Sequence, residues 1–227
     1  MSGHTWRLID WFRDNRGRSQ TLLAINSNLG PEIDIKRLLN STQGLDIEIY
    51  TSQEAVGTQA EYIRDGLDYG RWKTNVLTLL DAGITVHVMC TINALCLESL
   101  SDHLDYLMLL KHRYGRGKLI FTLNILRFPS FQSALVLPEN LRKHFQKDLQ
   151  QWLNQNGHSD RLHEHEVNHI QRLIDYLDVV KTPHSDAFDM PNLHNDFREF
   201  YRQYDQRRNK NFAATFPVIA TWYNSLQ

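Results

Sequence analysis

The 227-residue sequence predicts an α/β fold in which about four parallel strands form the sheet and further helices follow the last strand. Four short runs rich in branched apolar residues have the length of buried strands, and most are bounded by Gly, Asn or Ser. Longer stretches with helical periodicity lie between them. The runs begin at residues 21, 45, 84 and 119, and each spacing fits a strand plus a crossover helix. This rhythm indicates consecutive parallel βα units.

The individual elements follow in chain order. A first helix is predicted over Thr5–Arg13, because its apolar residues recur on one side. The predicted strands are Thr21–Asn26, Leu45–Thr51, Ile84–Ile92 and Leu119–Leu126, and the helices between them are Glu32–Asn40, Thr58–Asp81 and Glu98–His112. Because the first helix has no strand before it, we expect the sequence to begin in the middle of a βα unit.

After Pro138 the sequence predicts helices only. These are Leu141–Leu153, Leu162–Val180, Leu193–Asp205 and Phe212–Leu226, with breaks at Gly157–Ser159 and Thr182–Pro191. We therefore predict a parallel βα part over residues 1–156. A helical C-terminal extension over residues 157–227 is expected to pack on it.

Composition and charge argue against several classes of protein. The formal net charge of −1 gives no overall field that would attract nucleic acid or an anionic membrane. No apolar run approaches the roughly 18 residues of a membrane-spanning helix, and the first residues lack the pattern of a secretory signal. Cys90 and Cys96 are too few for a disulfide scaffold. We expect two reduced thiols in a cytoplasmic protein without membrane or nucleic-acid partners.

Polar side chains follow each predicted strand at its carboxyl end, where parallel βα proteins bind their ligands. Neutral donors and acceptors predominate, with one acid and one arginine among them, a set that suits a polar, zwitterionic small molecule. The alternative is that strand ends and loops are polar without any shared site. The residues concerned are Asn26, Ser27 and Asn28 after the first strand, Ser52 and Glu54 after the second, Thr91 and Asn93 after the third, and Arg127 and Pro129 after the fourth.

A set of short stretches, in order over nearly the whole chain, carries a family resemblance. They are Asn26-Ser27-Asn28, Thr51–Gly57, Ala60–Leu67, Ile125–Pro129, Val136–Pro138, Tyr204–Arg208, Asn211-Phe212 and Phe216-Pro217. The set resembles the radical S-adenosylmethionine superfamily, and more narrowly its twitch domain-containing proteins. The resemblance implies an incomplete (βα) barrel that uses S-adenosylmethionine and a [4Fe–4S] cluster. In that family, electron transfer from the cluster cleaves the cofactor to a radical that abstracts hydrogen from the substrate.

The resemblance also implies roles for individual residues. Ser52 and Glu54 would lie near the ribose or carboxylate of S-adenosylmethionine, and Arg64 would pair with that carboxylate, as a planar guanidinium can. The residues that would line the central cavity are Asn26, Ser27, Asn28, Thr91 and Asn93, and those that would border the adenine are Arg127 and Pro129.

Two motifs of the family are missing from this chain. The sequence has no C-x-x-x-C-x-x-C motif and no Gly-Gly-Glu-Pro motif, and its two cysteines cannot supply three thiolates to a cluster. We therefore expect a fragment or split subunit of a radical S-adenosylmethionine enzyme that is inactive alone. A partner chain or segment would supply the missing first strands, and the substrate, a small molecule or a peptide, is not identified by the sequence.

A second hypothesis is a zinc-dependent hydrolase. His165-Glu166-Val167-Asn168-His169 matches H-E-x-x-H, in which the two histidines bind zinc and the glutamate is the general base. A third ligand is needed, and His184 or an aspartate would have to provide it. On a helical wheel both histidines fall on the polar flank of the apolar stripe, so a solvated or cleft-facing helix edge is favoured over a zinc site.

A third hypothesis is a non-catalytic module that binds a nucleotide-like ligand or a protein partner. An unfinished barrel should expose a sheet edge and apolar surface on the side of the missing strands. The same feature would fit a split subunit.

Overall fold

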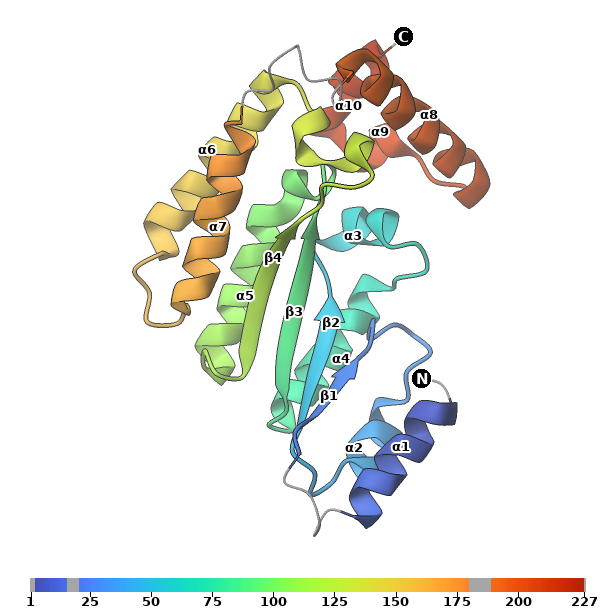
Figure 1. The fold of residues 1–227 in the computed structure, drawn as a ribbon, viewed down its shortest axis with the longest axis vertical. Coiled ribbons are helices and arrows are strands. Elements are labelled where there is room, and N and C mark those ends of the chain that lie inside the picture. The colour runs from blue at the N-terminus through green and yellow to red at the C-terminus, as the bar shows by residue number, and fades with distance from the viewer. Residues whose placement is uncertain (1–2, 16–20, 180–188, 227) are drawn as a thin grey trace.

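A computed structural model describes residues 3–15, 21–179 and 189–226 of the chain. A parallel sheet lies at its centre, with four strands in the order β1-β2-β3-β4 (Figure 1). The strands are β1 (Leu23–Asn26), β2 (Ile47–Ser52), β3 (Thr85–Ile92) and β4 (Leu119–Ile125). The predicted α/β class with four parallel strands is therefore confirmed.

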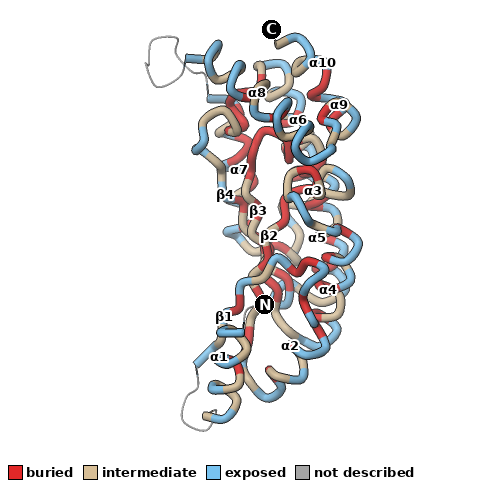
Figure 2. The backbone as a smooth tube through the Cα atoms, turned by 90° about the vertical axis from the view of Figure 1, so that its right-hand side faces the viewer, coloured by how far each residue is buried: buried red, intermediate tan, exposed pale blue. Residues whose placement is uncertain are grey.

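Helices join the neighbouring strands and cover one face of the sheet. They are α2 (Ile35–Ser41), α3 (Gly57–Ile63) followed by α4 (Tyr69–Asp81), and α5 (Leu100–Tyr114). Such crossovers are needed because a tight turn can join only antiparallel strands. Figures 1 and 2 show α2, α4 and α5 on the same side of the sheet. Side chains of the strands that face these helices, such as Ile49 and Val88, are fully buried, whereas their neighbours in β2 and β3 are only partly buried.

The structure differs from the sequence-based prediction between residues 58 and 81, where one helix is predicted and two are found. Gly66 has a φ of 82°, which a continuing α-helix cannot adopt. Helix α4 then begins anew at the cap Asp68, whose side chain accepts a hydrogen bond from the backbone N–H of Arg71 at 2.8 Å. The fully buried Trp72 of α4 donates its indole N–H to Thr51 Oγ1 at 3.1 Å, which fixes α4 against β2.

The outer edge of β4 is sealed by helix α7 (Glu164–Leu177), which pairs with α6 (Glu139–Asn156). The Glu166 carboxylate accepts the backbone N–H of Phe121 at 2.9 Å, and His169 Nδ1 accepts the N–H of Leu123 at 3.2 Å. Arg172 donates to the carbonyl of Leu123 at 2.7 Å. Side chains of α7 thus occupy the positions at which a further strand would form its hydrogen bonds. The predicted break at Gly157 lies in the turn between α6 and α7.

The last helices lie beyond the carboxyl ends of the strands (Figure 1). They are α8 (Met190–Arg208), α9 (Phe212–Thr215) and α10 (Pro217–Ser225); α8 and α9 contact α3, and α10 packs against α9. Tyr62 of α3 donates its hydroxyl to Asp205 at 2.7 Å, and Tyr204 donates to the Tyr62 carbonyl at 2.8 Å. At the other end of the chain, α1 (Gly3–Asp14) packs against α2, where the Arg37 guanidinium lies 4.2 Å from the centre of the Trp6 ring.

Candidate functional site

The face of the sheet opposite α2, α4 and α5, which we call the open face, is the best candidate site. Strand pairing places Asn26 beside Tyr50, Ser52 beside Met89, and Thr91 beside Asn124. These side chains are partly or fully exposed, in contrast to the buried side chains on the helix-covered face. Three of the predicted site residues, Asn26, Ser52 and Thr91, therefore share one polar surface.

A carboxylate, a phenol and an imidazole form a cluster on the open face that the sequence-based prediction did not include. Glu48 Oε2 accepts the hydroxyl of Tyr50 at 3.1 Å and lies 3.0 Å from His87 Nε2. The geometry of the latter contact is not that of an aligned hydrogen bond. The Tyr50 and His87 rings stack with centroids 4.2 Å apart. Desolvation, together with the Glu48 carboxylate, raises the pKa of Tyr50.

This cluster, Glu48-Tyr50-His87, can bind or exchange protons with a ligand on the open face. Glu48 and His87 keep 24% and 18% of their side-chain surface exposed, although the His87 Nε2 atom that faces Glu48 is buried. A carboxylate beside an imidazole is a common arrangement for acid–base chemistry. The sequence signal for it is the presence of polar residues at every second position of β2 and at His87 of β3, but only strand register shows that they meet.

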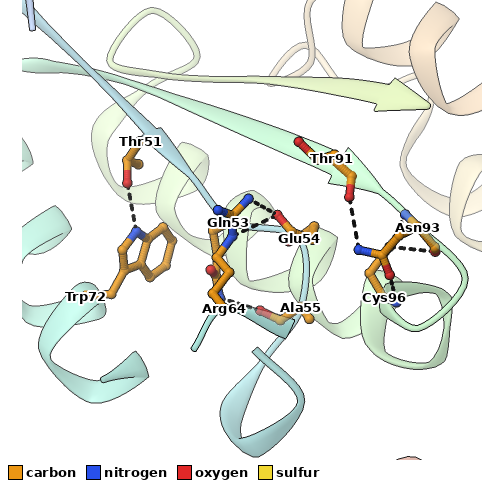
Figure 3. A network of polar contacts seen from close by, with 9 residues as sticks. All are labelled: Thr51, Gln53, Glu54, Ala55, Arg64, Trp72, Thr91, Asn93 and Cys96. Atoms are coloured by element: carbon orange, nitrogen blue, oxygen red, sulfur yellow. Dashed lines mark hydrogen bonds and ion pairs between the residues drawn. The ribbon is translucent and has the colours of Figure 1, made fainter. Parts of the chain in front are cut away.

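The predicted pair Glu54 and Arg64 lies at the carboxyl end of β2, and the two side chains bind each other. Arg64 donates through Nε at 3.1 Å and through Nη2 at 2.6 Å to the same oxygen, Glu54 Oε2 (Figure 3). Glu54 is buried, and burial raises its pKa, while the Arg64 charge opposes that rise. Arg64 keeps 29% of its side chain exposed. The family resemblance predicts that Arg64 binds the carboxylate of a cofactor. In the structure its guanidinium instead binds the carboxylate of Glu54.

Three other predicted site residues hold turns of the backbone. Asn93 Oδ1 accepts the N–H of Leu95 at 2.9 Å and that of Cys96 at 3.1 Å, and Figure 3 shows Asn93 beside Cys96. Ser27 Oγ accepts the Leu29 N–H at 3.1 Å, and Asn28 Oδ1 accepts the Gly30 N–H, also at 3.1 Å. Such local bonds are the usual reason for Asn and Ser in turns. These side chains therefore shape the loops that follow β1 and β3.

The last two predicted residues, Arg127 and Pro129, are exposed in the loop after β4. Arg127 and Asn124 line a cleft of about 420 Å³ together with Arg172 and Tyr176 of α7. The peptide bond before Pro129 is cis. The predicted residues therefore do not form one site. They lie on the open face, in the Glu54–Arg64 pair, in two turns and in the loop after β4, where Arg127 lines this cleft.

The H-E-x-x-H residues have structural partners. Glu166 is fully buried; its Oε1 lies 2.8 Å from Lys111 Nζ, and its Oε2 accepts the His163 N–H at 2.8 Å. With the Phe121 N–H also bound, this carboxylate is not free to act as a general base. His169 turns Nδ1 to the edge of β4, and burial lowers its pKa. His165 is exposed, and His184, one of the two candidates for the third ligand, lies outside the described residues.

The described residues contain no metal-binding group: within 3–15, 21–179 and 189–226, no three His, Cys, Asp or Glu side chains are arranged to hold a metal ion. Cys90 and Cys96 are both fully buried, and burial raises the pKa of each thiol. Two buried thiols with raised pKa values do not fit the ligand set of a [4Fe–4S] cluster.

Comparisons with known proteins give no relative for this chain. No family model, no curated protein and no solved structure matches it. Over the described residues, no helix has the length and apolar character to cross a membrane.

Proposed function

We propose that the chain is an incomplete (βα) barrel of the radical S-adenosylmethionine type that binds S-adenosylmethionine on the open face. One observation carries the proposal: polar side chains of all four parallel strands share a face that helices leave partly exposed. Hydroxyl, amide, carboxylate and imidazole groups in register suit a zwitterionic nucleoside. Further barrel strands would have to pair with β1, because α7 seals the outer edge of β4.

The chain's own residues have limited chemistry in this proposal. Ser52, Thr91 and Asn124 would orient the ligand, and Glu48 with His87 would hold or move a proton. The cluster that initiates radical chemistry in the family does not fit the two buried cysteines, so we assign no radical step to this chain alone. A split subunit or fragment that contributes ligand contacts is the form of the proposal that agrees with these residues.

Calorimetric titration with S-adenosylmethionine tests the proposal. Thr91→Val keeps the side-chain volume but removes a hydroxyl from the open face, and we expect it to weaken binding about threefold to tenfold, the effect of one hydrogen bond. Thr74→Val makes the same change at an exposed position of α4, a helix that covers the other face, and should leave affinity unchanged. Absence of heat with the wild-type chain, or equal losses in both variants, would contradict the proposal.

A spectroscopic prediction accompanies this experiment. After anaerobic reconstitution with iron and sulfide, the purified chain should show no [4Fe–4S] absorption, because its two thiols are buried and too few. Ultraviolet–visible spectra together with iron analysis check this. A stoichiometric cluster on the chain alone would refute it.

A further inference from the structure

A small cavity with several aromatic residues in its wall lies between α3, α8 and the loop that follows β3. Its volume is about 120 Å³, equivalent to about four water molecules at the ~30 Å³ that each occupies in the liquid. Four aromatic rings, two amide side chains and two aliphatic side chains, Ile63 and Leu95, form its wall. The rings belong to Tyr62, Phe200, Tyr201 and Tyr204, and the amides to Asn93 and Gln132.

The tyrosine hydroxyls that line this cavity have partners of their own. Tyr62 donates to Asp205 at 2.7 Å, Tyr204 donates to the Tyr62 carbonyl at 2.8 Å, and Tyr201 accepts from Gln132 Nε2 at 3.5 Å. The amide oxygen of Asn93 is bound to two backbone N–H groups. Most polar groups of the wall are therefore already hydrogen-bonded, and much of the remaining surface is aromatic. Such a wall favours a ligand that needs no directed hydrogen bond.

The electrostatics around the rings favour a positive guest. The Lys210 ammonium lies 5.6 Å from the Tyr62 ring centre and 5.5 Å from that of Tyr204, so both rings already contact one cation. That ammonium is paired with Asp65 at 3.1 Å, and the same carboxylate also binds the Arg208 guanidinium at 2.7 Å. The Asp205 carboxylate next to Tyr62 adds negative potential on the same side. Electron-rich ring faces attract cations, most strongly where water is excluded.

We propose that this cavity is an aromatic cage for a methylated ammonium group, such as the trimethylammonium head of a small organic cation. Such a group matches the site in three respects. It is compact, it carries its charge on methyl groups that stack against rings, and it donates no hydrogen bond. An unmethylated ammonium would have to exchange a full water shell for wall oxygens that mostly already take part in hydrogen bonds.

Titration with choline chloride tests the proposal, with 3,3-dimethylbutan-1-ol as the neutral molecule of the same shape. We expect choline to cause saturable shifts in the NMR signals of the cavity residues, and the neutral alcohol to bind at least tenfold more weakly. Equal binding of the two would show an apolar pocket without preference for charge and would overturn the proposal, as would absence of choline binding.

A matched pair of variants at Phe200 completes the test. Phe200 is the most exposed ring of the cage, with 39% of its surface accessible, so its replacement should be tolerated by the fold. Phe200→Leu should weaken choline binding about 2- to 5-fold, the effect of one cation–π contact at a partly exposed site, whereas Phe200→Tyr should retain it. Circular dichroism and thermal unfolding verify that both variants fold. Unchanged choline affinity in a folded Phe200→Leu variant would also overturn the assignment.

Discussion

Replacing Lys111 by methionine should lower the free energy of unfolding by about 3–5 kcal/mol, the cost of leaving one member of a buried ion pair alone. Lys111 Nζ lies 2.8 Å from Glu166 Oε1, and both side chains are fully buried. The ammonium also donates to the carbonyl of Leu119 at 2.7 Å. Methionine has a similar length but no charge, so the Glu166 carboxylate would keep its backbone donors and lose its counter-charge. Urea denaturation followed by circular dichroism measures the change.

A double-mutant cycle separates loss of the pair from loss of packing. In Lys111→Met with Glu166→Gln, the amide oxygen still accepts the Phe121 N–H, but no charge remains buried. The double variant should therefore be more stable than the sum of the single losses predicts, by about 2 kcal/mol. An additive result would mean that the two charges do not stabilise each other.

His165→Ala serves as the reference substitution on the same helix. Because His165 is exposed, its loss should change stability by less than about 0.5 kcal/mol. The contrast with Lys111 and Glu166 also bears on the zinc hypothesis. If the role of this helix is structural, replacing Glu166 should lower the free energy of unfolding far more than replacing His165. A zinc hydrolase would instead require both side chains for activity.

Periodicity predicted the architecture well because it reflects which side chains are buried. Runs such as Ile84–Ile92 alternate between a helix-covered face and the open face, and the observed strand differs by only one residue. The break between α3 and α4 was missed because both flanking segments have helical patterns and Gly66 alone interrupts them. That α7 seals β4 could not be predicted, since those bonds join residues more than 40 positions apart.

The candidate site was predictable only where local sequence determines it. The polar ends of strands gave Ser52 and Thr91, and their place on one face follows from the two-residue period of a strand. The contact between Glu48 and His87 depends on the register of β2 against β3, which no short pattern encodes. The carboxylate that binds Arg64 is likewise a tertiary feature, although both residues were singled out from the sequence.

Acidification should destabilise the protein through His103, by up to about 4–5 kcal/mol when the pH falls from 7 to 3. This imidazole lies on α5, fully buried near Trp72, and neither ring nitrogen has a well-aligned hydrogen-bond partner. Burial lowers its pKa to about 3, the Arg64 charge acts in the same direction, and a contact with the Gln53 backbone only partly opposes them. In the unfolded chain His103 has an ordinary pKa near 6.5, so below that pH it binds a proton that it does not bind in the folded chain.

The sign of this effect follows from proton linkage. Between pH 6.5 and 3 the unfolded state binds more protons, so stability falls as the pH decreases, and above about pH 7 His103 contributes no pH dependence. Denaturant midpoints measured from pH 7.5 to 4 give the slope. Other groups titrate in this range, including Glu54, whose raised pKa acts in the opposite direction. The informative quantity is therefore the difference between wild type and His103→Phe or His103→Leu.

Both His103 variants should lose less stability on acidification than the wild type, whatever their stability at neutral pH. The phenylalanine ring keeps the contact with Trp72. The leucine variant is included because phenylalanine is larger than histidine and could overpack the site. His112→Gln removes an exposed histidine from the same helix and should keep the wild-type slope. If the His103 variants and the wild type lose stability in parallel, the imidazole gains a partner or water when protonated, and burial does not exclude its charge.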